Sequence, residues 1–124
     1  MDIEDLDIVA KRVFERCMPA KEEMDESAEK SKFLEAFSGL EYSTIGHLLY
    51  ETIKIALIAG GADIVIGKIK SGKGGLEKSG EKMEKAAFEV LNEKISDETE
   101  ARQIAISIST TGREEFEIHI NSKK

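Results

Sequence analysis

Residues 103–121 read QIAISISTTGREEFEIHIN, and the predicted fold depends on this segment. Apolar side chains occupy every second position on both sides of a central TTGR, at Ile104, Ile106, Ile108, Phe116, Ile118 and Ile120. Alternation with a period of two is typical of a strand with one buried face. Because the centre contains a glycine, it suits the turn between two such strands. The segment therefore predicts a C-terminal β-hairpin.

A third strand is expected because a two-stranded hairpin is marginally stable in water by itself. Residues 62–69 are the candidate within the chain, since they are rich in β-branched side chains and follow Gly60-Gly61. Alternatively, the preceding helix continues through both glycines to about Lys70, at a cost of about 2 kcal/mol relative to alanine. Because of this cost, we favour the strand over residues 62–69. Alternatively, a second copy of the chain supplies the third strand.

Helices are predicted over most of the remaining sequence. Residues 3–18 carry one apolar stripe at three-to-four spacing, with acids in the first turn and Pro19 directly after. Further helices are expected over residues 21–38, from Ser43 or Thr44 to the glycines at 60 and 61, and over residues 76–95. The predicted fold is one α+β domain spanning residues 1–124, with about four helices on a small antiparallel sheet that includes the hairpin.

Composition and charge narrow the classes of function. The net charge of −7 disfavours binding to nucleic acid or to anionic membranes. Cys17 is the only cysteine, which excludes an intramolecular disulfide and a cysteine-based metal site within one chain. An acidic start and the lack of a long uninterrupted apolar run favour a cytoplasmic protein. Abundant Lys and Glu beside few Asn, Gln and Cys match a thermophile composition.

The Gly/Lys-rich segment 67–75, GKIKSGKGG, resembles a phosphate-binding loop in part. Gly67, Gly72 and Lys73 fit the P-loop pattern, but Gly74 stands where a hydroxyl should bind Mg²⁺, so a nucleotide hydrolase is disfavoured. Backbone N–H groups at the start of a helix could still hold an anion. The predicted anion-binding residues are Lys68, Lys70, Gly72, Lys73, Gly74, Gly75 and Lys78. The favoured interpretation of the loop itself is a solvated connector.

Other candidates for chemistry have simpler explanations. His47 and Glu51 lie one helical turn apart and could form half of a metal site or an acid–base pair, but an exposed polar contact is favoured. Cys17 falls on an apolar stripe, which indicates a small buried residue. No catalytic residue, metal site or cofactor is predicted.

The leading functional hypothesis is a non-catalytic interaction or assembly protein that forms homo-oligomers. It depends on the predicted strand over residues 114–120, which would present an open edge for pairing. The alternative is a binder of a phosphorylated small molecule or nucleotide, through residues 67–75 and the start of the next helix. The expected partner is thus a second copy or a small anion, without nucleic acid or membrane.

Overall fold

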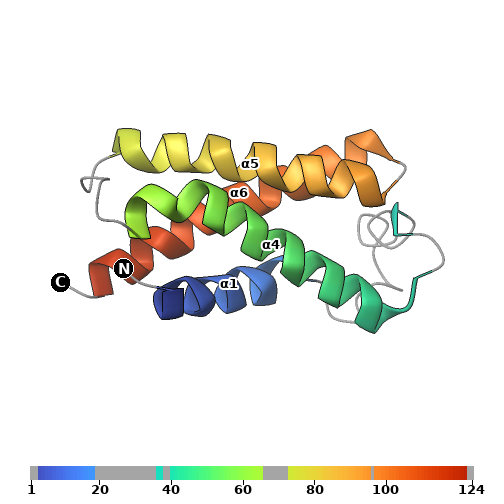
Figure 1. Cartoon of the computed structure of the whole chain (residues 1–124), viewed down its shortest axis with the longest axis horizontal. Helices are drawn as coiled ribbons and strands as arrows, with labels where there is room; N and C mark the ends of the chain where they lie inside the picture. Colours follow the sequence, from blue (N-terminus) through green and yellow to red (C-terminus); the bar gives the residue numbers. More distant parts are fainter. Residues whose placement is uncertain (1–2, 19–35, 38–39, 66–72, 96, 123–124) are drawn as a thin grey trace.

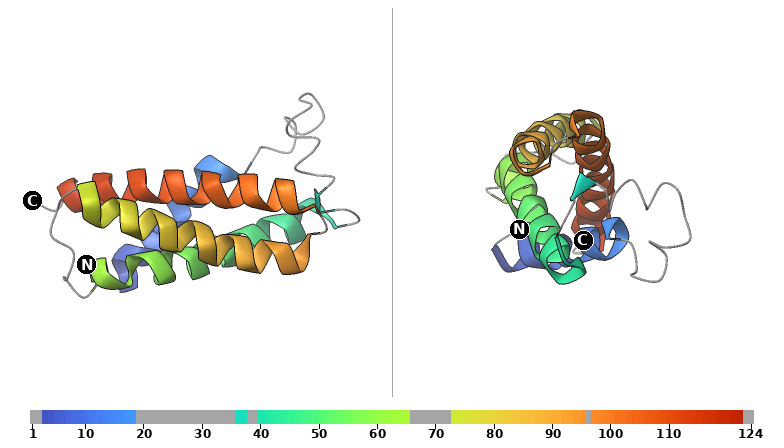
Figure 2. Two further views of the ribbon diagram at one scale, coloured as in Figure 1. Left: turned by 90° about the horizontal axis from the view of Figure 1, so that it is seen from above. Right: turned by 90° about the vertical axis from the view of Figure 1, so that its right-hand side faces the viewer.

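The computed structural model describes residues 3–18, 36–37, 40–65, 73–95 and 97–122. Within these ranges the elements are four helices: α1 (Ile3–Cys17), α4 (Tyr42–Val65), α5 (Lys73–Lys94) and α6 (Glu98–Ser122). Each helix packs side by side with two others, in the cyclic order α1, α4, α5, α6, and successive helices run in opposite directions (Figures 1 and 2). The arrangement is an up-and-down four-helix bundle.

The predicted α+β fold is wrong, because the described residues contain helices and no strand. The segment predicted as a C-terminal hairpin lies inside α6, which runs unbroken from Glu98 to Ser122. A strand and a helix both place residues i and i+4 on one face, so Ile104 with Ile108 fits either structure. In a strand, Ile106 would share the face of Ile104 and Ile108, and Ile118 would share that of Phe116 and Ile120. Ile106 and Ile118 are instead 45% and 52% exposed, as expected for a helix.

The buried stripe of α6 follows helical spacing, but small and polar side chains make up much of it. Its buried members are Ala101, Ile104, Ala105, Ile108, Ser109, Thr111, Gly112, Glu115, Phe116 and His119. Gly112, predicted to lie in a turn, faces α5 instead: a Cβ built there would be 2.8 Å from Met83 Sδ. A search for large apolar side chains alone therefore misses the helical period.

The predicted strand over residues 62–69 is also wrong for the part that is described. Residues 62–65 continue α4 as helix, while residues 66–69 lie outside the described ranges. A Cβ at Gly60 would lie 2.5 Å from the Ser79 carbonyl oxygen, and one at Gly61 would lie 2.7 Å from Phe116 Cζ. The glycines let α5 and α6 approach α4 closely, and this packing outweighs their cost in helix propensity.

Two of the other predicted helices are confirmed. The helix predicted over residues 3–18 is confirmed as α1, with Pro19 two residues beyond its end. The helix over residues 76–95 is confirmed as α5, although α5 begins three residues earlier, at Lys73. Most of the helix predicted over residues 21–38 lies outside the described residues.

The contacts of α5 with α4 and with α6 combine a dense apolar core with a buried hydrogen bond on each side. The Ser79 hydroxyl donates to the Gly60 carbonyl oxygen at 2.7 Å, and the Ser109 hydroxyl donates to that of Gly80 at 2.7 Å. Both bonds are buried, and in each the acceptor is the carbonyl oxygen of a glycine. Because glycine has no side chain, the two helix backbones can lie close together there. The largest fully buried side chains around them include Phe37, Ile45, Leu49, Ile53, Leu57, Met83, Leu91, Ile108 and Phe116.

Candidate binding surface

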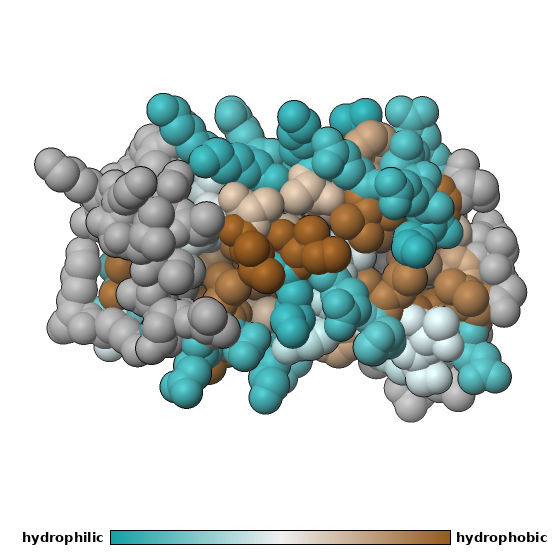
Figure 3. Space-filling model, in the orientation of Figure 1, coloured by the Kyte–Doolittle hydropathy of each residue, from teal (hydrophilic) through white to brown (hydrophobic). Residues whose placement is uncertain are grey.

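The outer side of α4 carries large apolar side chains that the bundle leaves uncovered. Ile55 and Ile58 are 44% and 53% exposed, Ala59 is exposed, and Leu48 is half-buried at the edge. These four residues are named here the α4 face. Figure 3 shows hydrophobic side chains, in brown, gathered across the middle of the molecule. Glu51, one turn after Leu48 and one turn before Ile55, is an exposed acid on the same side of the helix.

The α4 face exists because α4 is apolar on two sides. Its inner side packs Ile45, Leu49 and Ile53 into the core with no exposed area. A helix that is apolar all round is normally covered all round, whereas a helix at the surface of a bundle presents charges outward. In contrast, α1 presents Lys11 and Arg12 to solvent. Isolated exposed isoleucines, such as Ile8 and Ile118, are ordinary on protein surfaces.

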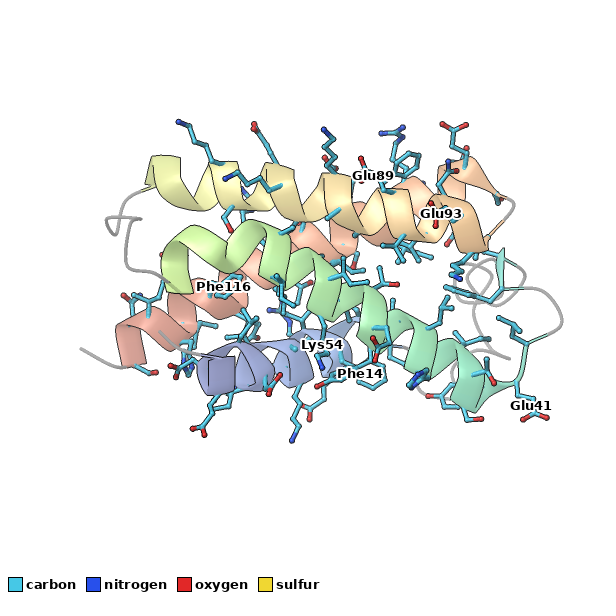
Figure 4. The ribbon with its side chains drawn as sticks, viewed as in Figure 1. Phe14, Glu41, Lys54, Glu89, Glu93 and Phe116 are labelled. Atoms are coloured by element: carbon cyan, nitrogen blue, oxygen red, sulfur yellow. The ribbon has the colours of Figure 1, made fainter. Side chains whose placement is uncertain are left out.

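Rigid side chains border the α4 face on the α1 side. Tyr50 packs edge-on against Phe14 of α1, with 5.6 Å between the ring centroids. The Lys54 ammonium lies 5.7 Å from the centroid of the Tyr50 ring, a distance that suits a cation–π contact (Figure 4). On this side the border is therefore aromatic and cationic.

The α5 side of the same face is bordered by a row of charges. Lys78, Lys82, Glu89 and Glu93 are exposed, and their spacing of four, seven and four residues places them along one face of α5. Figure 4 shows Glu89 and Glu93 at the end of α5 nearest α6's first turns. These four residues, named here the α5 charge stripe, are basic in the first half of the helix and acidic in the second.

Charges of opposite sign lie beside this stripe: the exposed Glu81 is three residues after Lys78, and the exposed Lys85 is four residues before Glu89. The partial charge of a helix is positive at its N-terminus and negative at its C-terminus, so acids are favoured early and bases late. The α5 charge stripe has the reverse order, with Lys78 and Lys82 before Glu89 and Glu93. Because the effect is confined to the first and last turns, only Glu93 of these four residues lies close enough to an end of α5 to be affected.

The structure describes only part of the predicted anion site. Lys68, Lys70 and Gly72 lie outside the described residues. Lys73, Gly74 and Gly75 form the first turn of α5 instead of a preceding loop, and Lys78 is an exposed residue further along the helix. Of the seven, only Lys78 has a described side chain, and anion binding at these residues stays a prediction.

Polar side chains between α1 and α6 form one buried pair and, nearer the surface, two ion pairs of Arg16. His119 Nε2 lies 2.8 Å from Asp5 Oδ1, and both side chains are about 6% exposed. Arg16 donates to Glu114 at 2.6 Å and to Glu115 at 3.1 Å, and these two hydrogen bonds raise the pKa of Arg16. Because His119 and Asp5 are closed to solvent and paired with each other, they hold α1 on the bundle and present no site to a substrate.

The remaining chemical candidates are separate from one another. His47 and Glu51 are both exposed on α4, and the described residues contain no group of three side chains that could hold a metal ion. Cys17 lies 3.7 Å from Ser107 Oγ, and burial raises the pKa of its thiol. Such a thiol is mostly protonated at neutral pH and reacts slowly.

The residues of the α4 face were not among the sequence-predicted site residues. The signal that could have found them is the apolar content of residues 45–59, which exceeds what a single buried face needs. Comparisons with protein-family models, curated proteins and solved structures find no match to this chain. Although α4 is strongly apolar, no helix in the described ranges has both the length and the hydropathy to cross a membrane.

Proposed function

We propose that this chain is a non-catalytic cytoplasmic assembly protein, which self-associates by packing its α4 face against the same face of another copy. The proposal is supported by one observation, the uncovered Ile55 and Ile58 on a helix that is apolar on both sides. The strand edge that first suggested assembly is not available, since residues 114–120 belong to α6. In this proposal the α4 face supplies the contact surface in place of the strand edge.

The free energy available from the α4 face indicates how large the contact must be. Covering a half-exposed isoleucine contributes about 1 kcal/mol, so Ile55 and Ile58 from two copies contribute about 4 kcal/mol. Association costs about 4–15 kcal/mol in lost translational and rotational freedom. The isoleucines alone offset only the low end of that range, so a stable contact must extend beyond α4 onto a neighbouring helix.

The mass of the purified protein in solution tests this proposal. We expect a multiple of the 13.7 kDa chain mass for the wild type and a monomer for Ile58→Lys. Ile118→Lys on α6 is the matched control, because Ile118 is 52% exposed and Ile58 is 53% exposed. Sedimentation velocity measures the masses, and circular dichroism verifies that each variant keeps its helices.

Two results would contradict the proposal. The first is a wild-type protein that stays monomeric up to concentrations of several hundred micromolar. The second is an equal loss of mass in Ile58→Lys and Ile118→Lys, which would make the effect a general one of added charge and not one of the α4 face.

A further inference from the structure

We propose that the groove between α4 and α6 is a binding site for an amphipathic helix of another chain, and that α1 is its exchangeable occupant. The groove is distinct from the α4 face of the proposed function, because α1 covers it. In the end-on view of Figure 2, α1 lies across α4 and α6, which have few direct contacts with each other. A helix that takes the place of α1 therefore contacts both.

Much of the groove surface beneath α1 is small or polar. On α4, a Cβ at Gly46 would lie 3.6 Å from Phe14 Cζ, and one at Gly61 would lie 3.4 Å from Leu6 Cδ1. The side chains that meet α1 through a ring or a polar group are Tyr50, Ser107, Glu114, Glu115 and His119. We name these seven residues the α1 seat. In this respect the seat resembles transient interfaces, which are more polar than permanent ones.

The apolar part of the α1 contact is small. Within α1, the side chains with almost no exposed area are Val9, Ala10 and Val13. In α4, isoleucines and leucines are buried completely, at Ile45, Leu49, Ile53 and Leu57. Also, α1 is the shortest of the described helices. Because segments with few buried apolar contacts open at the lowest free energy, we expect α1 to open while the other three helices stay packed.

The polar pairs orient α1 more than they stabilise it. His119 Nε2 lies 2.8 Å from Asp5 Oδ1 in a buried pair, and the cost of removing such groups from water offsets much of their attraction. Near the other end of α1, Arg16 pairs with Glu114 and Glu115, but its side chain is 44% exposed. Exposed ion pairs contribute little stability. Opening of α1 returns all these groups to water, whereas complementary charges still select which helix fits the seat.

The connection of α1 to the rest of the chain is long enough for exchange. Residues 18–35 separate α1 from the buried Ala36, whereas residues 66–72 and 95–97 join the other helices. A chain of that length spans roughly 60 Å when extended. Departure of α1 therefore requires no displacement of α4, α5 or α6.

The α1 seat specifies the chemistry of the partner helix. Asp5 and Arg16 are three turns apart on α1, about 17 Å along a helix. A fitting helix carries an acid, residues of valine or alanine size four, five and eight positions later, and an arginine eleven positions after the acid. Its acid meets His119, and its arginine meets Glu114 and Glu115.

Disulfide trapping tests for an exchanged helix. Cys17 Sγ lies 3.7 Å from Ser107 Oγ, so a thiol at position 107 reaches position 17 of whichever helix occupies the seat. The full chain with Cys17→Ser and Ser107→Cys cannot form this disulfide with its own α1. A synthetic peptide of residues 1–18, which carries the native Cys17, is added in a buffer of reduced and oxidised glutathione. We expect a disulfide between the peptide and position 107, measured by the mass of the intact adduct.

A second position and altered peptides are the controls. Thr110 is exposed like Ser107, so Thr110→Cys in the same background measures non-specific reaction. Relative to the glutathione adduct at each position, we expect at least ten times more peptide adduct at 107 than at 110. A peptide with Val9→Asp and Val13→Asp should give the level seen at 110. A peptide with Arg16→Glu should give less adduct, and Glu114→Lys with Glu115→Lys in the chain should restore it.

Hydrogen exchange of the wild-type chain tests the opening without any substitution. We expect the α1 amides to exchange, in low concentrations of urea, through an opening that leaves α4, α5 and α6 protected. The proposal is overturned if α1 exchanges only together with the other helices, if positions 107 and 110 trap the peptide equally, or if the valine substitutions leave trapping unchanged. Trapping at 107 that depends on the valines and on Arg16 supports it, whatever the mass of the chain in solution.

Discussion

The inner and outer sides of α4 both carry large apolar side chains, but the inner side also contains two glycines at its closest contacts with other helices. On the inner side, Gly60 and Gly61 have so little volume that Ser79 and Phe116 approach the α4 backbone closely. On the outer side, Ile55 and Ile58 project from the helix and remain about half exposed. The two glycines mark where neighbouring helices reach the α4 backbone, whereas the described helices leave Ile55 and Ile58 partly uncovered.

The difference shows that burial, and not hydrophobicity, decides whether an apolar residue of α4 stabilises the core. Ile53 and Ile55 are the same residue type two positions apart, but one has no exposed area and the other has 44%. The energetic consequence of changing them should differ accordingly, and the following measurements test this comparison.

The largest expected effect comes from shortening the two isoleucines. We expect Ile53→Ala to lower the free energy of unfolding by about 2–5 kcal/mol, since a cavity opens in a packed core. Ile55→Ala should change it by less than about 1 kcal/mol at a concentration where the chain is monomeric. Urea denaturation of both variants measures the difference, and equal losses would contradict the distinction between the two sides.

A somewhat smaller effect is expected from filling the inner contact. Gly60→Ala should destabilise by about 1–3 kcal/mol, because the added Cβ meets the Ser79 carbonyl oxygen at 2.5 Å. Gly46→Ala on the same helix is the control: its Cβ would meet Phe14 no closer than 3.6 Å. That variant should stabilise by up to about 1 kcal/mol through helix propensity. Thermal unfolding measures the opposite signs, and stabilisation by both alanines would show that α4 and α5 are further apart.

The inner hydrogen bonds should have a smaller effect again. Ser109→Ala removes the donor to the Gly80 carbonyl oxygen and should cost about 1 kcal/mol. Thr110→Ala, at the exposed neighbouring position, should leave stability within about 0.5 kcal/mol of the wild type or raise it. If chemical denaturation shows no difference between the two variants, the Ser109 hydroxyl does not stabilise the α5–α6 contact.

The least disruptive test uses the native thiol at the α1–α6 contact. Burial raises the pKa of Cys17, so less thiolate is present at neutral pH and its reaction with a disulfide reagent should be slower than that of an unfolded-chain thiol. Because the pKa is raised, the rate should keep increasing with pH after the rate for the unfolded chain has levelled. Equal rates in the folded and the urea-unfolded protein would indicate that α6 does not cover Cys17.

Local signals were enough to predict part of the fold. The acidic first turn, the apolar stripe and Pro19 define α1 without reference to the rest of the chain, and the structure confirms it. The helix that became α5 was found from its apolar spacing, with an error of three residues at its start. Such signals act within a few residues and are legible in sequence.

The predictions that failed concern residues whose role depends on a distant neighbour. Gly60, Gly61 and Gly112 break a helix in isolation, but here they face Met83, Ser79 and Phe116 from other helices. Alternating isoleucines in residues 103–121 fit a strand until the burial of Ser109, Glu115 and His119 is known. The α4 face was likewise missed, because the sequence does not say which side of an apolar helix its neighbours cover.

By itself, the sequence determined that α1 is a helix ending before Pro19 and that α5 is amphipathic. Only the tertiary structure decided that the glycines lie inside helices and that Ile55 and Ile58 remain outside the core. The reason is physical: helix caps and charge order act over a few residues, whereas burial depends on which distant helix arrives at each side.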